Sequence, residues 1–197
     1  MSVLEKKPTR EGERVLLVVL FVVYLALLAW IVLWKLEIPY IGGGALRQIK
    51  LIPFAPGAGD GPSKPFEVVA NLLLFVPFGV YLRLLAPSWP WWKAVGVVAG
   101  ASLLLETAQY VLAVGNSDVT DLVVNTVGGL AGIGLLALAR RRLRARTARV
   151  MTRVCSVGTV LALVAVGAFV ASPLHYSQRH VAVVPTHSVS AQGGGTR

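Results

Sequence analysis

Long uninterrupted hydrophobic runs dominate the chain. A helix needs roughly 20 apolar residues to cross a hydrocarbon core of about 30 Å, where irregular backbone is too costly. Strands of a membrane barrel would instead alternate apolar and polar residues. The pattern predicts an all-α, polytopic helical membrane protein with about five transmembrane helices. The predicted spans are residues 15–34, 68–85, 92–114, 122–139 and 154–172.

The segments between the runs complete this organisation. Residues 1–14 form a polar N-terminal flank, and the first run is too long for a secretory signal peptide, so it is interpreted as a retained anchor. The loop over 35–67 is rich in glycine and proline, which predicts turns rather than one helix. Its apolar piece 51–54 is expected on the membrane surface or folded back against the spans. Residues 173–197 are predicted to be a flexible tail.

Composition fits this class, since 55% of the 197 residues are hydrophobic and only 14% are charged. A disordered chain has less apolar surface, and a soluble domain carries more charge. The single cysteine, Cys155, excludes an internal disulfide framework and a thiolate metal cluster. The histidines of the tail are irregularly spaced, so the sequence predicts no metal site and no cofactor.

The net charge of +10 is unevenly distributed and predicts the orientation. With the N-terminus inside, 13 of the 19 basic residues flank the inner ends of the spans, most densely over 140–153. The positive-inside rule therefore favours N-in, C-out. Because this basic run lies between two spans, we expect residues 140–153 to form a cytoplasmic loop that contacts anionic lipid of the inner leaflet rather than nucleic acid. The predicted lipid contacts are Arg140, Arg141, Arg142, Arg144 and Arg146.

Polar side chains inside an apolar run are costly, and Glu106 is the most costly of them. It lies about 20 Å from the inner end of its span, in the outer half of the bilayer. Gln109, one turn further along, shares its helix face. The carboxyl group could donate a proton, accept a hydrogen bond from a ligand, or serve as a neutral hydrogen-bonding strut.

Other polar residues fall at a similar depth. Asp118 precedes the fourth run, whose N-terminus Thr120 or Asp121 can cap, and Asn125 lies one turn beyond Asp121. Asn71 lies about one turn below the outer end of the second run. Convergence at one depth predicts a single ligand-binding cluster, although a purely structural hydrogen-bonded cluster would look the same. Its predicted members are Asn71, Glu106, Gln109, Asp118, Asp121 and Asn125.

Glycine and proline indicate where helices pack. Pro77 interrupts the hydrogen bonding of the second run and should bend it, and Gly79 follows closely. Gly128 and Gly132 form a small-xxx-small pair, which lets helices approach closely. The residues assigned to helix packing are Pro77, Gly79, Gly128, Gly129 and Gly132, with Gly134 added from the same run.

Taken in order, these motifs resemble the VanZ-like family of small membrane proteins. The matching pieces are residues 51–54, residues 71–79, Glu106 with Gln109, the group Asp118, Asp121 and Asn125, and Gly128–Gly129. They cover about residues 49 to 134, and their order is more specific than any one of them. Family members often carry Gly-Arg shortly before the aspartates, where this chain has Gly115 and Asn116.

The resemblance implies a helical membrane domain over 15–139 in a bacterial plasma membrane, and a family association with resistance to the glycopeptide teicoplanin. Our leading hypothesis is a non-enzymatic protein of the cell envelope that binds a lipid head group, a cell-wall precursor or a glycopeptide. The alternative is a membrane enzyme acting on a lipid-linked substrate, with Glu106 as general acid/base and Asp118 with Asp121 holding a divalent cation. A scaffold that packs against another membrane protein is a third possibility.

Overall fold

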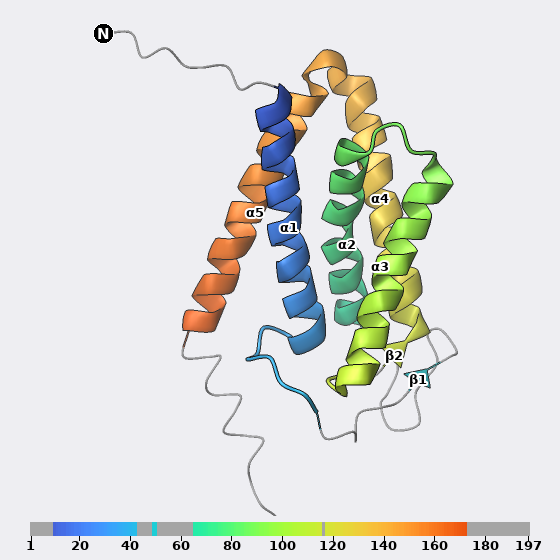
Figure 1. Ribbon diagram of the computed structural model, residues 1–197, viewed down its shortest axis with the longest axis vertical. Coiled ribbons are helices and arrows are strands. Elements are labelled where there is room, and N and C mark those ends of the chain that lie inside the picture. The colour runs from blue at the N-terminus through green and yellow to red at the C-terminus, as the bar shows by residue number, and fades with distance from the viewer. Residues whose placement is uncertain (1–9, 43–48, 51–64, 116, 173–197) are drawn as a thin grey trace, which may run out of the picture.

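The computed structural model describes residues 10–42, 49–50, 65–115 and 117–172, and it is almost entirely helical (Figure 1). The expectations for 1–9, 51–54 and the tail 173–197 lie outside the described residues. The elements in order are α1 Arg10–Trp34, β1 Ile49–Lys50, α2 Pro65–Leu85, α3 Trp91–Leu112, β2 Ser117–Asp118, α4 Val119–Leu143, the 3-10 turn η1 Arg144–Arg146 and α5 Thr147–Ala171.

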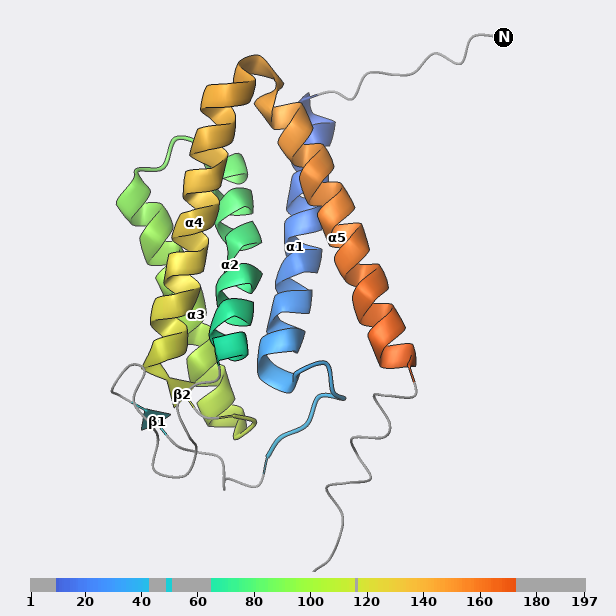
Figure 2. The same ribbon diagram turned by 180° about the vertical axis from the view of Figure 1, so that it is seen from behind.

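The predicted all-α, polytopic membrane fold is confirmed. Four helical stretches of the described chain are long and apolar enough to cross a membrane, and the last of them covers Val119–Ala171. That stretch is folded back on itself at η1, so α4 and α5 run in opposite directions (Figure 2). Successive helices alternate in direction throughout, and every second connection therefore lies at the same end of the bundle (Figure 1).

The helices extend beyond most of the predicted spans. The basic stretch 140–153, expected as a loop, is helical on both sides of η1. Arginine is a good helix former, and cations are favourable at a helix C-terminus, so α4 continues to Leu143. The helix stops there because Arg144 adopts a positive φ of 49°. In contrast, α3 ends two residues early, at Leu112, where Ala113 takes a left-handed conformation with φ 53°.

The tightest contact in the bundle lies between α2 and α4, and glycine makes it possible. A Cβ added at Gly128 or Gly132 would collide with the backbone carbonyl of Leu72 or Val76, respectively. A Cβ at Gly79 would likewise collide with the carbonyl of Gly129. The two backbones therefore touch, as expected of small-residue helix contacts in membranes.

On the other side of α2, α1 packs through aromatic residues. The Phe21 and Phe78 rings meet edge to face with centroids 5.5 Å apart, and the Tyr24 hydroxyl donates a 2.6 Å hydrogen bond to the Leu74 carbonyl. Helix α5 lies beside α1 (Figure 2). It joins α2 through a 2.8 Å hydrogen bond between the Tyr81 and Thr159 hydroxyls. These contacts form a second layer on the α2–α4 pair.

Aromatic residues mark both ends of the bundle. At one end the Trp30 and Trp34 indoles donate to the carbonyls of Glu37 and Tyr40, at 2.7 and 2.9 Å. At the other end Trp91 and Trp92 are exposed at the start of α3. Tryptophan is enriched where the hydrocarbon meets the head groups, so these two groups indicate the two membrane interfaces.

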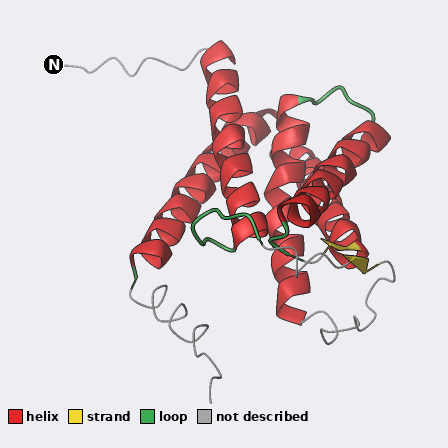
Figure 3. Cartoon of the chain, turned by 60° about the horizontal axis from the view of Figure 1, so that its bottom comes forward, coloured by secondary structure: helices red, strands yellow, loops and turns green. Residues whose placement is uncertain are grey.

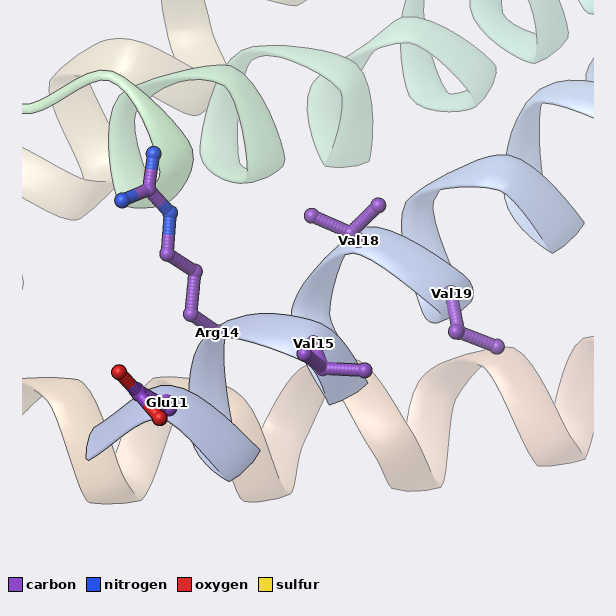
Figure 4. Close-up of a pocket in the computed structure, with 5 residues that line it drawn as sticks. All are labelled: Glu11, Arg14, Val15, Val18 and Val19. Atoms are coloured by element: carbon purple, nitrogen blue, oxygen red, sulfur yellow. The ribbon is translucent and has the colours of Figure 1, made fainter. Parts of the chain in front are cut away.

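Basic residues lie at the end that carries Trp91. The start of α1 is there, with Glu11, Arg14 and the apolar side chains Val15, Val18 and Val19 lining a shallow hollow (Figure 4). All five come from one helix, so this hollow is part of the outer face of α1 and holds no convergent polar groups. The ends of α2 and α4 and the start of α5 add most of the other arginines to this end.

The N-in orientation can be tested by labelling. In a Cys155→Ala background, a cysteine replacing exposed Glu37 should react with a membrane-impermeant maleimide in intact cells. A cysteine replacing exposed Ser88, between α2 and α3, should react only after permeabilisation. The opposite pattern would show that the basic end faces outward.

Candidate functional site

The polar residues singled out in the sequence gather at the end of the bundle opposite the described arginines of α2, α4 and α5. They are held there by a sharp return of the chain between α3 and α4. The Ala113 and Val114 N–H groups bond back to the carbonyls of Tyr110 and Gln109, at 3.2 and 3.1 Å. The chain then passes through β2 and re-enters the bundle as α4. This return brings Asp118 directly against the last turns of α3.

Glu106 fixes the return in place. Its Oε2 accepts a 2.9 Å hydrogen bond from the Asp118 backbone N–H and a 3.2 Å bond from the Ser117 hydroxyl. The side chain is only 4% exposed. These hydrogen bonds make Glu106 a strut that holds β2 onto α3, and its roles as a proton donor or as an acceptor for a ligand stay predictions.

The cap of α4 is Asp118, and the expectation that Thr120 or Asp121 caps it is wrong. Asp118 is extended (φ −123°, ψ 122°), and its Oδ1 accepts a 2.8 Å hydrogen bond from the Thr120 N–H. The helix begins at Val119 because this acceptor satisfies an N–H group that the first turn leaves unpaired. Asp121 is therefore in the first helical turn, where its charge is favourable.

Asp121 joins α4 to α2. Its Oδ1 accepts a 2.8 Å hydrogen bond from the Asn71 amide nitrogen, and both side chains are half-buried. Glu67, Lys35 and Asp118 lie close enough to Asp121 to act on it electrostatically. We call Asn71, Glu106, Asp118 and Asp121 the polar cluster. Within it, Asn71 and Asp121 are the more accessible members.

Asn125 and Gln109 lie at the edges of the polar cluster. Asn125, one turn below Asp121 and 1% exposed, donates to the Ser102 hydroxyl of α3 at 2.9 Å. Gln109 instead turns toward α1 and donates to the Val32 carbonyl at 3.0 Å. The amide oxygens of both residues are buried and have no hydrogen-bond partner among the described residues.

In the described part of the long loop, the short strand β1 lies against the polar cluster. The backbone of β1 pairs in parallel with β2, with Ile49 opposite Ser117 and Lys50 opposite Asp118. Figure 3, which brings this end forward, shows the two short strands beside the helix ends. The residues immediately before the 51–54 motif thus lie next to the segment that Glu106 holds.

Sequence reasoning missed two members of this network. Ser117 adjoins Asp118 in the sequence. Ser102 lies one turn before Glu106 on the same face of α3, and a serine within an apolar run was the signal that could have revealed it.

In the described part of the chain, no three His, Cys, Asp or Glu side chains are arranged to hold a metal ion.

Comparison with known proteins gives a family match over most of the described helices. A profile of the VanZ/LLP1 family matches residues 21–140. The chain belongs to the VanZ/LLP1 family. Protein VanZ of Enterococcus faecium is 32% identical over 126 residues, which is 63% of this chain and 75% of that protein. No solved structure matches the chain significantly. The VanZ/LLP1 match contains the polar cluster and the glycine contact, whereas α5 lies beyond it.

Proposed function

We propose that this VanZ-like protein acts in the bacterial plasma membrane by binding a lipid head group, a cell-wall precursor or a glycopeptide at the polar cluster, and so contributes to glycopeptide resistance. The observation that supports this most directly is the convergence of Asn71, Glu106 and Asp121 from three helices at one end of the bundle. Polar groups are retained in an apolar bundle at a cost, and such groups mark functional sites by default.

The depth of the polar cluster suits a ligand of the head-group region. Gln109 bonds to the carbonyl of Val32, so this level of α3 lies two residues from Trp34, at the aromatic end of α1. Glu106 is one turn deeper, about 4.5 Å at 1.5 Å per residue. A ligand could therefore reach Asp121 from the interface while its acyl or prenyl chains stay in the lipid.

The cluster divides into a fixed part and an accessible part. The carboxyl groups of Glu106 and Asp118 are buried and accept hydrogen bonds from backbone N–H groups. They therefore set the position of the N-terminus of α4. Asp121 and Asn71 are half-buried and face each other across the α2–α4 contact. In this proposal Asp121 contacts the ligand and Glu106 positions it.

The Asp121→Asn variant tests the proposal. It keeps the shape of the side chain and removes its charge, so we expect normal expression with a lowered glycopeptide inhibitory concentration. A charge-assisted hydrogen bond contributes about 1.5–3 kcal/mol, which corresponds to at least tenfold weaker ligand binding. The matched control is Glu37→Gln, which removes an exposed acidic charge at the same end outside the cluster. Unchanged resistance in Asp121→Asn would contradict the proposal.

We also propose that the basic end contacts anionic lipid. Arg141, Arg142, Arg144 and Arg146 are exposed there, as such contacts require. Arg140 is partly engaged within the protein, because its guanidinium donates a 2.8 Å hydrogen bond to the Arg83 carbonyl.

A further inference from the structure

The hydrogen-bonding groups at the polar end are unequally used. The donor atoms of Asn71 and Ser117 bond to Asp121 and Glu106, and the amide nitrogens of Gln109 and Asn125 bond to Val32 and Ser102; each amide nitrogen carries a second N–H. The buried side-chain atoms without any partner in the described chain are acceptors, the amide oxygens of Gln109 and Asn125. A ligand that complements these oxygens must bring donors.

The orientation of Gln109 follows from its partner. The Val32 carbonyl can only accept a hydrogen bond, so the amide nitrogen must face it and the oxygen must face away. The side chain is 9% exposed, and a buried acceptor without a donor is unfavourable. A donor supplied by a ligand would remove this penalty.

The charged residues around the polar cluster also favour a ligand that donates hydrogen bonds. Asp118 and Asp121 act electrostatically on Glu106, and Glu67 acts on Asp121, so the described surroundings contain four acids. Lys35 is the cation recorded near Asp121. The described arginines instead lie on the helix ends at the opposite end of the bundle. The acids of the polar cluster would repel a phosphate and attract a cation.

We infer that the polar cluster selects a primary ammonium group, presented at head-group depth and first met by Asp121. An ammonium has three donors and no acceptor, which complements carboxylates and amide oxygens that lack a donor. This inference rests on the proposed function and names the ligand chemistry of the same site. Two sources could supply the group: the head group of an aminolipid, or the free amine of a glycopeptide.

Binding to the full-length protein in phosphatidylcholine nanodiscs tests the inference. Short-chain phosphatidylethanolamine should bind at least about tenfold more tightly than its N-acetylated derivative or short-chain phosphatidylglycerol if the lipid is the source. Teicoplanin should exceed its N-acetylated derivative by a similar factor if the glycopeptide is the source. Asp121→Asn and Gln109→Leu should each remove the preference, and Glu37→Gln should keep it.

Two results would overturn the inference. One is N-acetylation without effect in both arms, and the other is phosphatidylglycerol binding as tightly as phosphatidylethanolamine. If the amine preference is absent while Asp121→Asn still lowers resistance, the ammonium is wrong and the proposed function stands. If the preference is present and depends on Asp121 while resistance is unchanged, the ligand is right and the proposed role in resistance is wrong.

Discussion

Replacing Gly132 with alanine is expected to lower the free energy of unfolding by about 3 kcal/mol, the upper end of the range for overpacking. The added Cβ would collide with the Val76 carbonyl oxygen and would lie 3.1 Å from the Val80 nitrogen. Both are backbone atoms of α2, so no side-chain rotation can relieve the collision. The helices would have to separate, and the α2–α4 contact would be lost along its length.

Gly134→Ala is the matched control, because the expectation that Gly134 packs against a helix is wrong: a Cβ there meets nothing within 4 Å in the described chain. Both substitutions gain the same helix propensity, about 1 kcal/mol in an exposed helix interior, so their difference isolates the contact. Unfolding of the detergent-purified variants by titration with SDS would measure it. Equal unfolding midpoints for the two variants would show that α2 and α4 do not touch at Gly132.

Removing the carboxyl group of Glu106 is expected to have the second-largest effect. Glu106→Ala would leave the buried Asp118 N–H and the Ser117 hydroxyl without their acceptor. A buried donor left without its partner costs about 1–3 kcal/mol, so we expect a loss of about 2 kcal/mol. Glu106→Gln retains one acceptor oxygen and should lose less.

Thr107→Ala provides the comparison for Glu106→Ala. Thr107 is the next residue of α3, is exposed, and bonds only to the Leu103 carbonyl of its own helix among the interactions described. The unfolding midpoint of the Thr107→Ala variant should stay near that of the parent protein. Hydrogen exchange of the Asp118 amide should also accelerate in Glu106→Ala and stay slow in Thr107→Ala. Slow exchange in both variants would mean that Glu106 does not hold β2.

The sequence was sufficient to predict the helices because apolar runs of this length have one stable form in lipid. It also placed Asn71, Glu106 and Asp121 at one end, since alternating spans fix which termini share a side. It could not predict which side chains would pair. Asp118 caps α4 because the chain turns back after Ala113. This turn lets Glu106 accept a hydrogen bond from the Asp118 backbone N–H. This depends on a left-handed residue that is not glycine and therefore carries no clear sequence signal.

The sequence also could not predict which neighbours the Gln109 and Asn125 side chains bond to. Both were expected to join the carboxyl groups, because they share the depth of Glu106. Gln109 instead bonds to the α1 backbone, and Asn125 bonds to Ser102. Helical spacing defines the face of a residue, but the neighbour on that face depends on helix packing, which here is set by the glycines of α4.

The pairing of α2 with α4 has a consequence for how the protein is made. These two helices are joined at both ends, by Asn71 to Asp121 and by Arg140 to the Arg83 carbonyl, and α3 is synthesised between them. Helix α2 leaves the ribosome before α4 has been synthesised. The face of α2 that carries Gly79 therefore lies in the lipid or the translocon until α4 has been inserted. Biogenesis therefore includes a late step in which α4, once synthesised, packs against α2. A chain truncated before residue 119 should accordingly be inserted but remain accessible to membrane proteases.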